Sequence, residues 1–173
     1  MSRPATPGQT VGPFFAFGLE YAGDSELVPA EHPDAITLRG RVLDGAGEPV
    51  PDALVELWQA GPDGRVVQQA GSLRRDGETF TGWGRCGTDA AGRYAFTTLP
   101  TGAPFLALTV LARGLLDRLV TRAYLPDTAA DPFLRGLGDR HGSLLATRDE
   151  GGFVFDIRLQ GDDETVFLVH PRD

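Results

Sequence analysis

The region from residue 36 to residue 111 repeats one pattern, in which a short apolar or alternating segment is followed by a turn rich in Gly, Pro and Asp. In 36–44, Ile, Leu, Gly and Val alternate with Thr and Arg, which is typical of a strand with one buried face. Residues 53–58 are apolar at almost every position, so we expect a strand that is covered on both faces. The sequences at 45–47 and 61–64 are turn formers. Short strands separated by such turns are typical of a β-sandwich.

Three more strands are expected before residue 112. Residues 80–85 indicate a strand that is interrupted by glycine. The turn former at 89–92 is followed by Tyr94 and Phe96 at a period of two, which predicts a hairpin. Residues 105–111 form a second almost continuous apolar run, for which we expect a buried strand.

The C-terminal third of the chain gives a less uniform pattern. Residues 115–125 fit a helical face as well as they fit a strand, and spacing alone does not choose between them. Asp131 and Pro132 can begin a helix as N-cap and first-turn proline. The most regular alternation of the chain, at 153–159, predicts a strand, and residues 165–169 indicate a last one.

About eight short strands with one or two short helices predict an all-β protein, and a β-sandwich is the most economical fold. A chain of 173 residues fits one domain, which we expect to span 36–173. Residues 1–35 contain five prolines but also Phe14, Phe15 and Phe17, which a disordered tail would not usually hold. We therefore expect an extended N-terminal arm that packs either on its own core or on a partner subunit.

Composition narrows the possible partners. With 16 basic and 24 acidic residues the net charge is −8, so long-range electrostatics disfavour nucleic acid and anionic membrane surfaces. The apolar run at 105–112 is too short to span a bilayer, and the N-terminal residues lack the pattern of a signal peptide. Cys86 is the sole cysteine, so no intrachain disulfide can form, and we interpret it as a packing residue. We expect a soluble cytoplasmic protein.

The usual signatures of catalytic and metal-binding chains are absent from the sequence. His32, His141 and His170 are not at ligand spacing from one another, and there is no HxH, no cysteine pair and no G-x-S-x-G sequence. We therefore assign no catalytic residue and no metal ligand to this chain by itself.

Arg113 is the strongest candidate for binding. It directly follows an apolar strand and precedes Gly114, so its backbone would be anchored while its guanidinium points into a cleft. In an acidic protein, a local arginine is what an anionic ligand would need. An ion pair with a nearby carboxylate explains the same placement equally well.

Five segments, in order along the chain, together resemble the intradiol ring-cleavage dioxygenase family. They are Thr10-Val11-Gly12-Pro13-Phe14, GRVLD and PVPDALVELWQA within 40–60, GWGRCGTDAAGRYAF at 82–96, ARGLLDRLVTRAYLPD at 112–127, and FDIRLQGDDETVF at 155–167. The resemblance covers nearly the whole chain and is carried by the five segments jointly, because each alone is weak.

The resemblance implies a β-sandwich that pairs with a homologous β subunit, the αβ pairs repeating in a larger assembly. In such members the β subunit holds Fe(III) with two tyrosines and two histidines, the histidines in an HxH on a core strand. Here the two corresponding positions hold Phe105 and Ala107, neither of which can donate to iron. The tyrosine-bearing loop before that strand is also missing, because 99–103 leads almost directly into it. The implied cofactor is therefore Fe(III) bound by the partner β subunit, and this chain is the noncatalytic half.

The implied reaction is the O2-dependent cleavage of protocatechuate between its two hydroxyl-bearing carbons, which gives 3-carboxy-cis,cis-muconate. By similarity, Thr10, Gly12 and Pro13 line the substrate pocket over the partner's iron, and Arg113 receives the substrate carboxylate. Glycine allows a close approach of the backbone and proline stiffens it.

Two alternatives belong to other classes. A stand-alone transthyretin-like β-sandwich that binds a ligand would suit the hairpin at 89–96, but the apolar arm and the resemblance over 112–167 count against it. A self-sufficient ring-cleaving enzyme would need iron ligands that are missing at positions 105 and 107.

Overall fold

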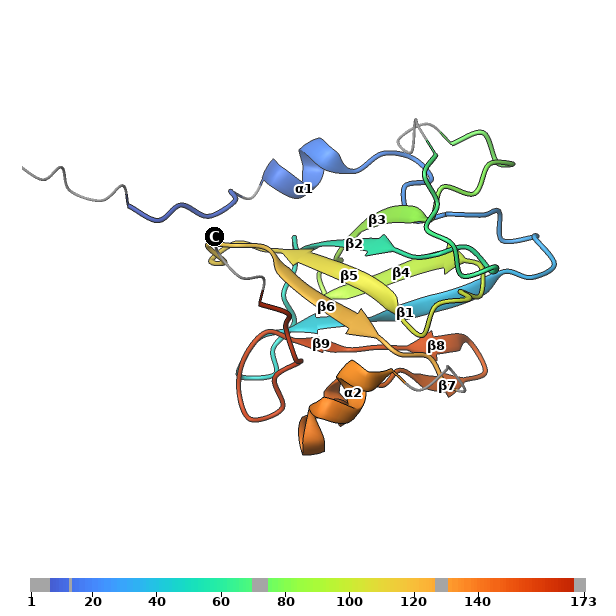
Figure 1. Ribbon diagram of the computed structural model, residues 1–173. Coiled ribbons are helices and arrows are strands. Elements are labelled where there is room, and N and C mark those ends of the chain that lie inside the picture. The colour runs from blue at the N-terminus through green and yellow to red at the C-terminus, as the bar shows by residue number, and fades with distance from the viewer. Residues whose placement is uncertain (1–6, 13, 70–74, 127–130, 170–173) are drawn as a thin grey trace, which may run out of the picture.

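The strands form two sheets that face each other across one hydrophobic core (Figure 1). The computed structural model describes residues 7–12, 14–69, 75–126 and 131–169. Its strands are β1 (Ile36–Leu43), β2 (Leu54–Trp58), β3 (Trp83–Gly87), β4 (Arg93–Thr98), β5 (Leu106–Leu111), β6 (Leu119–Ala123), β7 (Thr147–Asp149), β8 (Gly152–Val154) and β9 (Ile157–Arg158). One sheet has the order β4-β1-β8-β7, with β9 also paired to β1, and the other has the order β3-β2-β5-β6. The predicted β-sandwich is confirmed.

The main strands lie where the apolar pattern predicts them. β1, β2 and β5 each begin and end within a residue of the expected segments. Within the ambiguous segment 115–125, residues 119–123 form strand β6, because they pair antiparallel with β5, with Leu119 opposite Val110, and residues 115–118 belong to the loop before it. The hydrogen-bonding groups along the edge of β5 thus favour a strand here, where the spacing of apolar residues fits a helix equally well.

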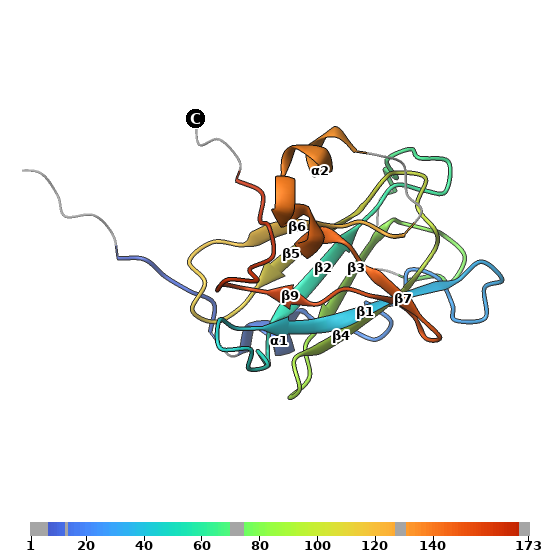
Figure 2. The same ribbon diagram turned by 90° about the horizontal axis from the view of Figure 1, so that it is seen from below.

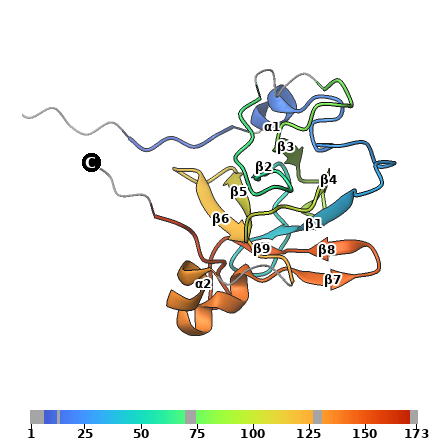
Figure 3. The same cartoon turned by 45° about the vertical axis from the view of Figure 1, so that its right-hand side comes forward.

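Short helices lie outside the two sheets (Figure 3). Helix α2 (Pro132–Gly136) begins as predicted, because the side chain of Asp131 accepts a hydrogen bond from the amide of Phe133 at 2.9 Å. A 3-10 helix (Gly138–Leu144) follows it. Helix α1 (Phe14–Leu19) lies within the N-terminal arm and was not expected, and it buries only Ala16.

Two strand assignments near the C-terminus differ from the prediction. The segment 165–169 is extended but is not a strand, because its hydrogen bonds are divided between two neighbours: the Thr165 amide donates to the Arg158 carbonyl, and the Leu168 amide donates to the Val120 carbonyl. β7 was missed because all three of its residues are exposed, so no apolar alternation marks it.

The predicted strand 153–159 is divided into β8 and β9. Both run parallel to β1 in one register, with Phe153 opposite Leu38 and Ile157 opposite Val42. Figure 2 shows β1 between β4 and β9. The ladder is broken after the Phe155 amide, which donates to the Arg39 carbonyl, because the Phe155 carbonyl lies over Gly40 and accepts from the Tyr94 phenol.

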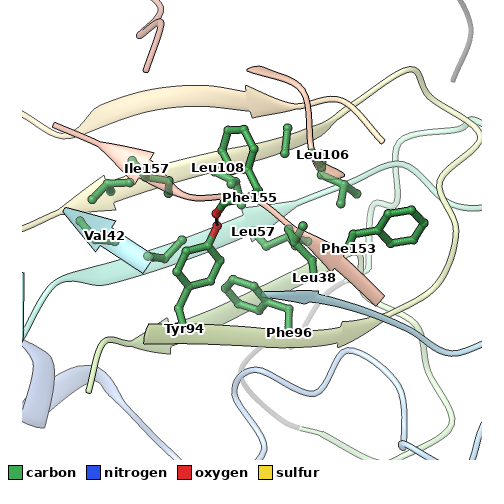
Figure 4. Packing of buried hydrophobic residues seen from close by; sticks show 14 of the residues in the cluster. Leu38, Val42, Leu57, Tyr94, Phe96, Leu106, Leu108, Phe153, Phe155 and Ile157 are labelled. Carbon is green, nitrogen blue, oxygen red and sulfur yellow. Dashed lines mark hydrogen bonds between the residues drawn. The ribbon is translucent and has the colours of Figure 1, made fainter. Parts of the chain in front are cut away.

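Tyr94 bridges this break from β4. Its phenol donates to the Phe155 carbonyl at 2.5 Å, as Figure 4 shows. Gly40 in β1 leaves the space for that carbonyl, since a Cβ atom at Gly40 would lie 1.9 Å from the Phe155 oxygen. On the other side of the break, the Asp156 carboxylate accepts from the Arg41 amide at 2.9 Å. The buried polar groups at the interruption are therefore paired.

Part of the N-terminal region packs on its own sandwich. Leu27 and Val28 are buried, and the Leu27 amide donates to the Thr97 carbonyl at 2.8 Å. The Arg85 amide donates to the Asp24 carbonyl, so residues 24–28 lie between the edge strands of the two sheets. Contact of the arm with a partner subunit stays a prediction.

Cys86 is partly buried and packs against the main core. Burial raises the pKa of its thiol, which disfavours the nucleophilic thiolate. Within the described residues, no helix is long and apolar enough to cross a membrane.

We expect Tyr94→Phe to lower the free energy of unfolding by about 1–3 kcal/mol, because the buried Phe155 carbonyl loses its partner. Urea denaturation measures this change. Burial also raises the pKa of Tyr94 well above its ordinary value, so this residue contributes stability that is present below about pH 10 and is lost as the pH rises above it. The loss of stability above pH 10 should therefore be shallower in Tyr94→Phe, and an unchanged slope would contradict this account.

Candidate functional site

Arg113 lies in the loop of residues 112–118 that joins β5 to β6, which we call the β5–β6 loop. Its side chain is 52% exposed, so the guanidinium is accessible from solvent. The next residue, Gly114, has a φ of +90°, a conformation that L side chains rarely adopt. Strand β5 thus anchors Arg113 on one side, and the glycine turns the chain away on the other, as the sequence suggests.

The N-terminal arm is fastened to this loop by Thr10. Its hydroxyl oxygen accepts from the Gly114 amide at 2.8 Å and lies 3.5 Å from the Ala112 carbonyl, to which the hydroxyl donates. Thr10 therefore holds the backbone on both sides of Arg113. Two of the predicted site residues, about a hundred positions apart in sequence, are brought together in this way.

The other predicted residues of the arm are less defined by contacts. Gly12 is exposed, and a Cβ atom added to it would meet nothing within 4 Å. Pro13 lies outside the described residues. The substrate-binding roles of Thr10, Gly12, Pro13 and Arg113 stay predictions.

Arg113 does make the ion pair that the sequence left open as an alternative, and its partner is Asp52, which was not expected at this site. Its Oδ2 atom lies 2.9 Å from Nη2 of Arg113 in an ion pair. Asp52 also has a φ of 61°, and no other non-glycine residue in the described part of the chain has a positive φ. For residues other than glycine this region costs about 1–2 kcal/mol, less for Asp and Asn. The sequence signal is the pair Pro51-Asp52 just before a strand, a proline followed by a residue that tolerates a positive φ.

The strand register explains why Asp52 meets Arg113. β2 and β5 are antiparallel, with Leu54 opposite Leu111. Asp52 precedes Leu54 by two residues and Arg113 follows Leu111 by two, so the ion pair continues the same register beyond the ladder. The contact is therefore fixed by the two central strands of the sheet.

The hollow beside these residues is small. The arm and the β5–β6 loop enclose about 100 Å³, lined in part by Thr10, Leu115 and Arg118. A cavity that holds benzene has about 150 Å³, so this one does not enclose an aromatic ring. Larger hollows of about 560 and 670 Å³ lie elsewhere, and neither is lined by Thr10, Gly12 or Arg113. Arg113 and Gly12 do not line the small hollow either, so none of these three hollows brings the predicted site residues together.

Phe105 and Ala107 lie on the outward face of the sheet that contains β5. Leu106 and Leu108 point into the core, so by the period of two the residues between and before them face the opposite side. Ala107 is opposite Trp58 on one side and Arg122 on the other. Phe105 packs in a second cluster, separate from the main core, with Tyr124 and Phe133.

Arg122 occupies the centre of this second cluster. Its guanidinium carbon lies 4.0 Å from the ring centroid of Phe105 and 4.8 Å from that of Phe133. Nη1 of Arg122 lies 3.2 Å from Oδ2 of Asp131, to which the Tyr124 phenol donates at 2.7 Å. That hydrogen bond lowers the pKa of Asp131, so its carboxylate stays ionised beside Arg122. The space over Phe105 is filled by an ion pair and aromatic rings.

Among the described residues, we find no set of side chains that fits a ferric ion. The phenols of Tyr94 and Tyr124 already donate to the Phe155 carbonyl and to the Asp131 carboxylate. Among the described residues, no three His, Cys, Asp or Glu side chains are grouped so that they could hold a metal ion. Neither Phe105 nor Ala107 has a donor atom.

Comparison with known proteins identifies relatives along nearly the whole chain. A family model described as Dioxygenase (Dioxygenase_C) matches residues 12–127. The protocatechuate 3,4-dioxygenase α chain of Burkholderia cepacia is 38% identical over 191 residues, covering 94% of this chain and 96% of that one. The α chain from Pseudomonas putida is 35% identical, with 95% and 96% covered. The β chain of B. cepacia is 36% identical, but the match covers 76% of this chain and 67% of that one.

Solved structures share the same fold. The dioxygenase domain of a dioxygenase–carbohydrate-binding protein fusion from Streptomyces sp. SirexAA-E superposes with a TM-score of 0.58 at 24% identity, covering 91% of this chain and 99% of that one. An intradiol ring-cleavage dioxygenase from Tetranychus urticae gives a TM-score of 0.55 at 14% identity, with 93% and 96% covered. At these identities the likeness shows the fold alone.

We expect Arg122→Met to lower the free energy of unfolding by about 1–3 kcal/mol, because a largely buried carboxylate loses its cationic partner. Helix α2 should open first, seen as faster hydrogen exchange of the amides in 133–137. Arg135→Met, in the same helix but exposed, is the matched control and should change the stability by less than about 0.5 kcal/mol. Equal effects of the two variants would show that the Arg122 cluster does not hold α2.

Proposed function

The chain belongs to the intradiol ring-cleavage dioxygenase family, and we propose that it is the α subunit of a protocatechuate 3,4-dioxygenase, without iron of its own. The observation that carries this proposal is the absence of donors at Phe105 and Ala107, on the outward face of β5. The match to α chains over 94–95% of this chain, against 76% for a β chain, supports the same assignment. These relatives also favour it over a stand-alone transthyretin-like binding module.

In this proposal Fe(III) is held by a homologous β subunit. The B. cepacia relatives are an α chain and a β chain of one enzyme, which supports an enzyme of two kinds of subunit. The ferric ion and O2 together supply the ring-opening chemistry, which converts protocatechuate to 3-carboxy-cis,cis-muconate. The part of this chain is to close the site, to orient the substrate and to exclude water.

Arg113 is the group on this chain that receives the substrate carboxylate. Its guanidinium is accessible and its backbone is fixed by β5 and by the hydrogen bonds of Thr10. Arginine binds a carboxylate with planar, charge-assisted hydrogen bonds. Asp52 is paired with one end of this guanidinium, and the exposed remainder offers donors to an anionic substrate in a chain whose net charge is −8.

The N-terminal arm completes the wall. Thr10 fastens the arm to the β5–β6 loop, and Gly12 and Pro13 follow it directly. A Cβ atom at Gly12 would meet nothing within 4 Å, so there is space beside its α carbon for a substrate or a partner surface. The cavity of about 100 Å³ becomes large enough for an aromatic ring only when the β subunit supplies the opposite wall.

We expect this chain to copurify with a homologous iron-bearing chain when the two are produced together. Iron analysis should then find the metal in the complex and on the isolated partner, and less than one-tenth of an equivalent on this chain alone, about the limit set by adventitious binding. A monodisperse monomer that never captures the partner would contradict the subunit proposal. Stoichiometric iron on the isolated chain would overturn the interpretation of Phe105 and Ala107.

In the assembled enzyme, Arg113→Ala should raise the KM for protocatechuate about 10- to 100-fold, as expected for the loss of a charge-assisted hydrogen bond. The KM for catechol, which has no carboxylate, should change less than about 3-fold. Steady-state kinetics with both substrates measure the difference. Arg65→Ala is the control, because Arg65 is exposed and lies in the loop after β2, at the opposite end of the sheet. Equal effects of Arg113→Ala on both substrates would remove its carboxylate role.

A further inference from the structure

We propose that Asp52 is a positioning residue for Arg113, which holds the guanidinium in the orientation that receives the substrate carboxylate. This inference rests on the proposed function of Arg113. Asp52 acts through Arg113 and touches no reacting atom. Its effect should therefore appear only with a substrate that carries a carboxylate.

The contact is built on the two central strands of the sheet. Asp52 and Arg113 continue the β2–β5 register just beyond its last pair, Leu54 and Leu111. Thr10 fixes the backbone on both sides of Arg113 through Ala112 and Gly114. A site residue that is supported by strands and by a second contact is held more precisely than one on a free loop.

The turn at Asp52 does not by itself explain why this position holds an aspartate. We infer that the contact of its side chain with Arg113 is the reason. A proline followed by a residue with positive φ is the pattern of a type II turn, in which Gly or Asn is favoured at the second position. Asp52 holds that position with a φ of 61°. Backbone conformations of this kind persist where the surroundings require them, and they gather at functional sites.

Other turn aspartates of this chain use their carboxylates differently. Asp44 accepts from the amides of Ala46 and Glu48, and Asp89 accepts from the amides of Ala91 and Arg93. These carboxylates stabilise their own turns. The carboxylate of Asp52 instead accepts from a guanidinium 61 positions away.

The geometry leaves Arg113 able to bind a second carboxylate. A guanidinium has five N–H donors, and the contact with Asp52 is made through Nη2. About half of the Arg113 side chain is exposed. A partner at one end of the guanidinium reduces the freedom that the side chain loses when the substrate binds at the other.

The test uses Asp52→Gly and Asp52→Asn in the assembled enzyme, with protocatechuate and catechol as substrates. Both residues tolerate positive φ, so the turn is kept. Gly removes the acceptor, whereas Asn keeps an oxygen that can accept from Nη2. If the Gly variant does not assemble, Asp52→Ser, whose side chain is one bond shorter, takes its place.

We expect Asp52→Gly to raise the KM for protocatechuate about 3- to 10-fold, with the KM for catechol within about 2-fold of the wild-type value. Asp52→Asn should stay within about 3-fold for both substrates, because its side chain still accepts a hydrogen bond. In the Arg113→Ala background, Asp52→Gly should have no further effect on the KM for protocatechuate, as a double-mutant cycle detects.

Other outcomes overturn the inference. An equal rise for both substrates would assign Asp52 a purely structural role. A fall in the KM for protocatechuate would show that Asp52 competes with the substrate for Arg113. If Arg113→Ala raises the KM for protocatechuate more than that for catechol but Asp52→Gly does not, the positioning role of Asp52 is wrong and the proposed role of Arg113 stands. If Arg113→Ala changes the KM for both substrates equally, the proposed role of Arg113 in binding the carboxylate is itself wrong.

Discussion

The approach of the Phe155 carbonyl to Gly40 is the contact on which the closed sandwich depends. It brings β8 and β9 alongside β1, although the ladder between them is interrupted, and the Tyr94 phenol satisfies the carbonyl that the interruption leaves free. A side chain at Gly40 would prevent that approach. Because β8 and β9 are held beside β1 in this way, the inward faces of both sheets are occupied by core packing. The functional residues therefore lie on outward faces and at strand ends.

The outward face around β5 has become structural. Where the resemblance would have two iron ligands, Phe105 and Ala107 leave an apolar surface that a stacked and ion-paired Arg122 covers. The side chains of this ion pair are only 25% and 12% exposed, so breaking it would leave either charge poorly solvated. The cluster therefore holds α2 against the sheet.

The ends of β2 and β5 hold the functional residues that remain. Their register brings Asp52 and Arg113 together, and Thr10 of the arm fixes the loop from the other side. What results is a charged, accessible edge beside a cavity too small for an aromatic ring. Such an edge forms a substrate site only when a second surface lies opposite it. The proposed function therefore requires the proposed assembly with a β subunit.

The sequence by itself determined the sandwich, the helix that begins at Asp131 and Pro132, and the family, because these depend on local alternation, capping residues and motifs. It also pointed to Arg113. Only the tertiary structure decided that 119–123 is a strand, that 165–169 is not, and that Asp52 meets Arg113. The physical reason is that these features depend on which hydrogen-bonding edges lie side by side, and residues far apart in sequence set that arrangement.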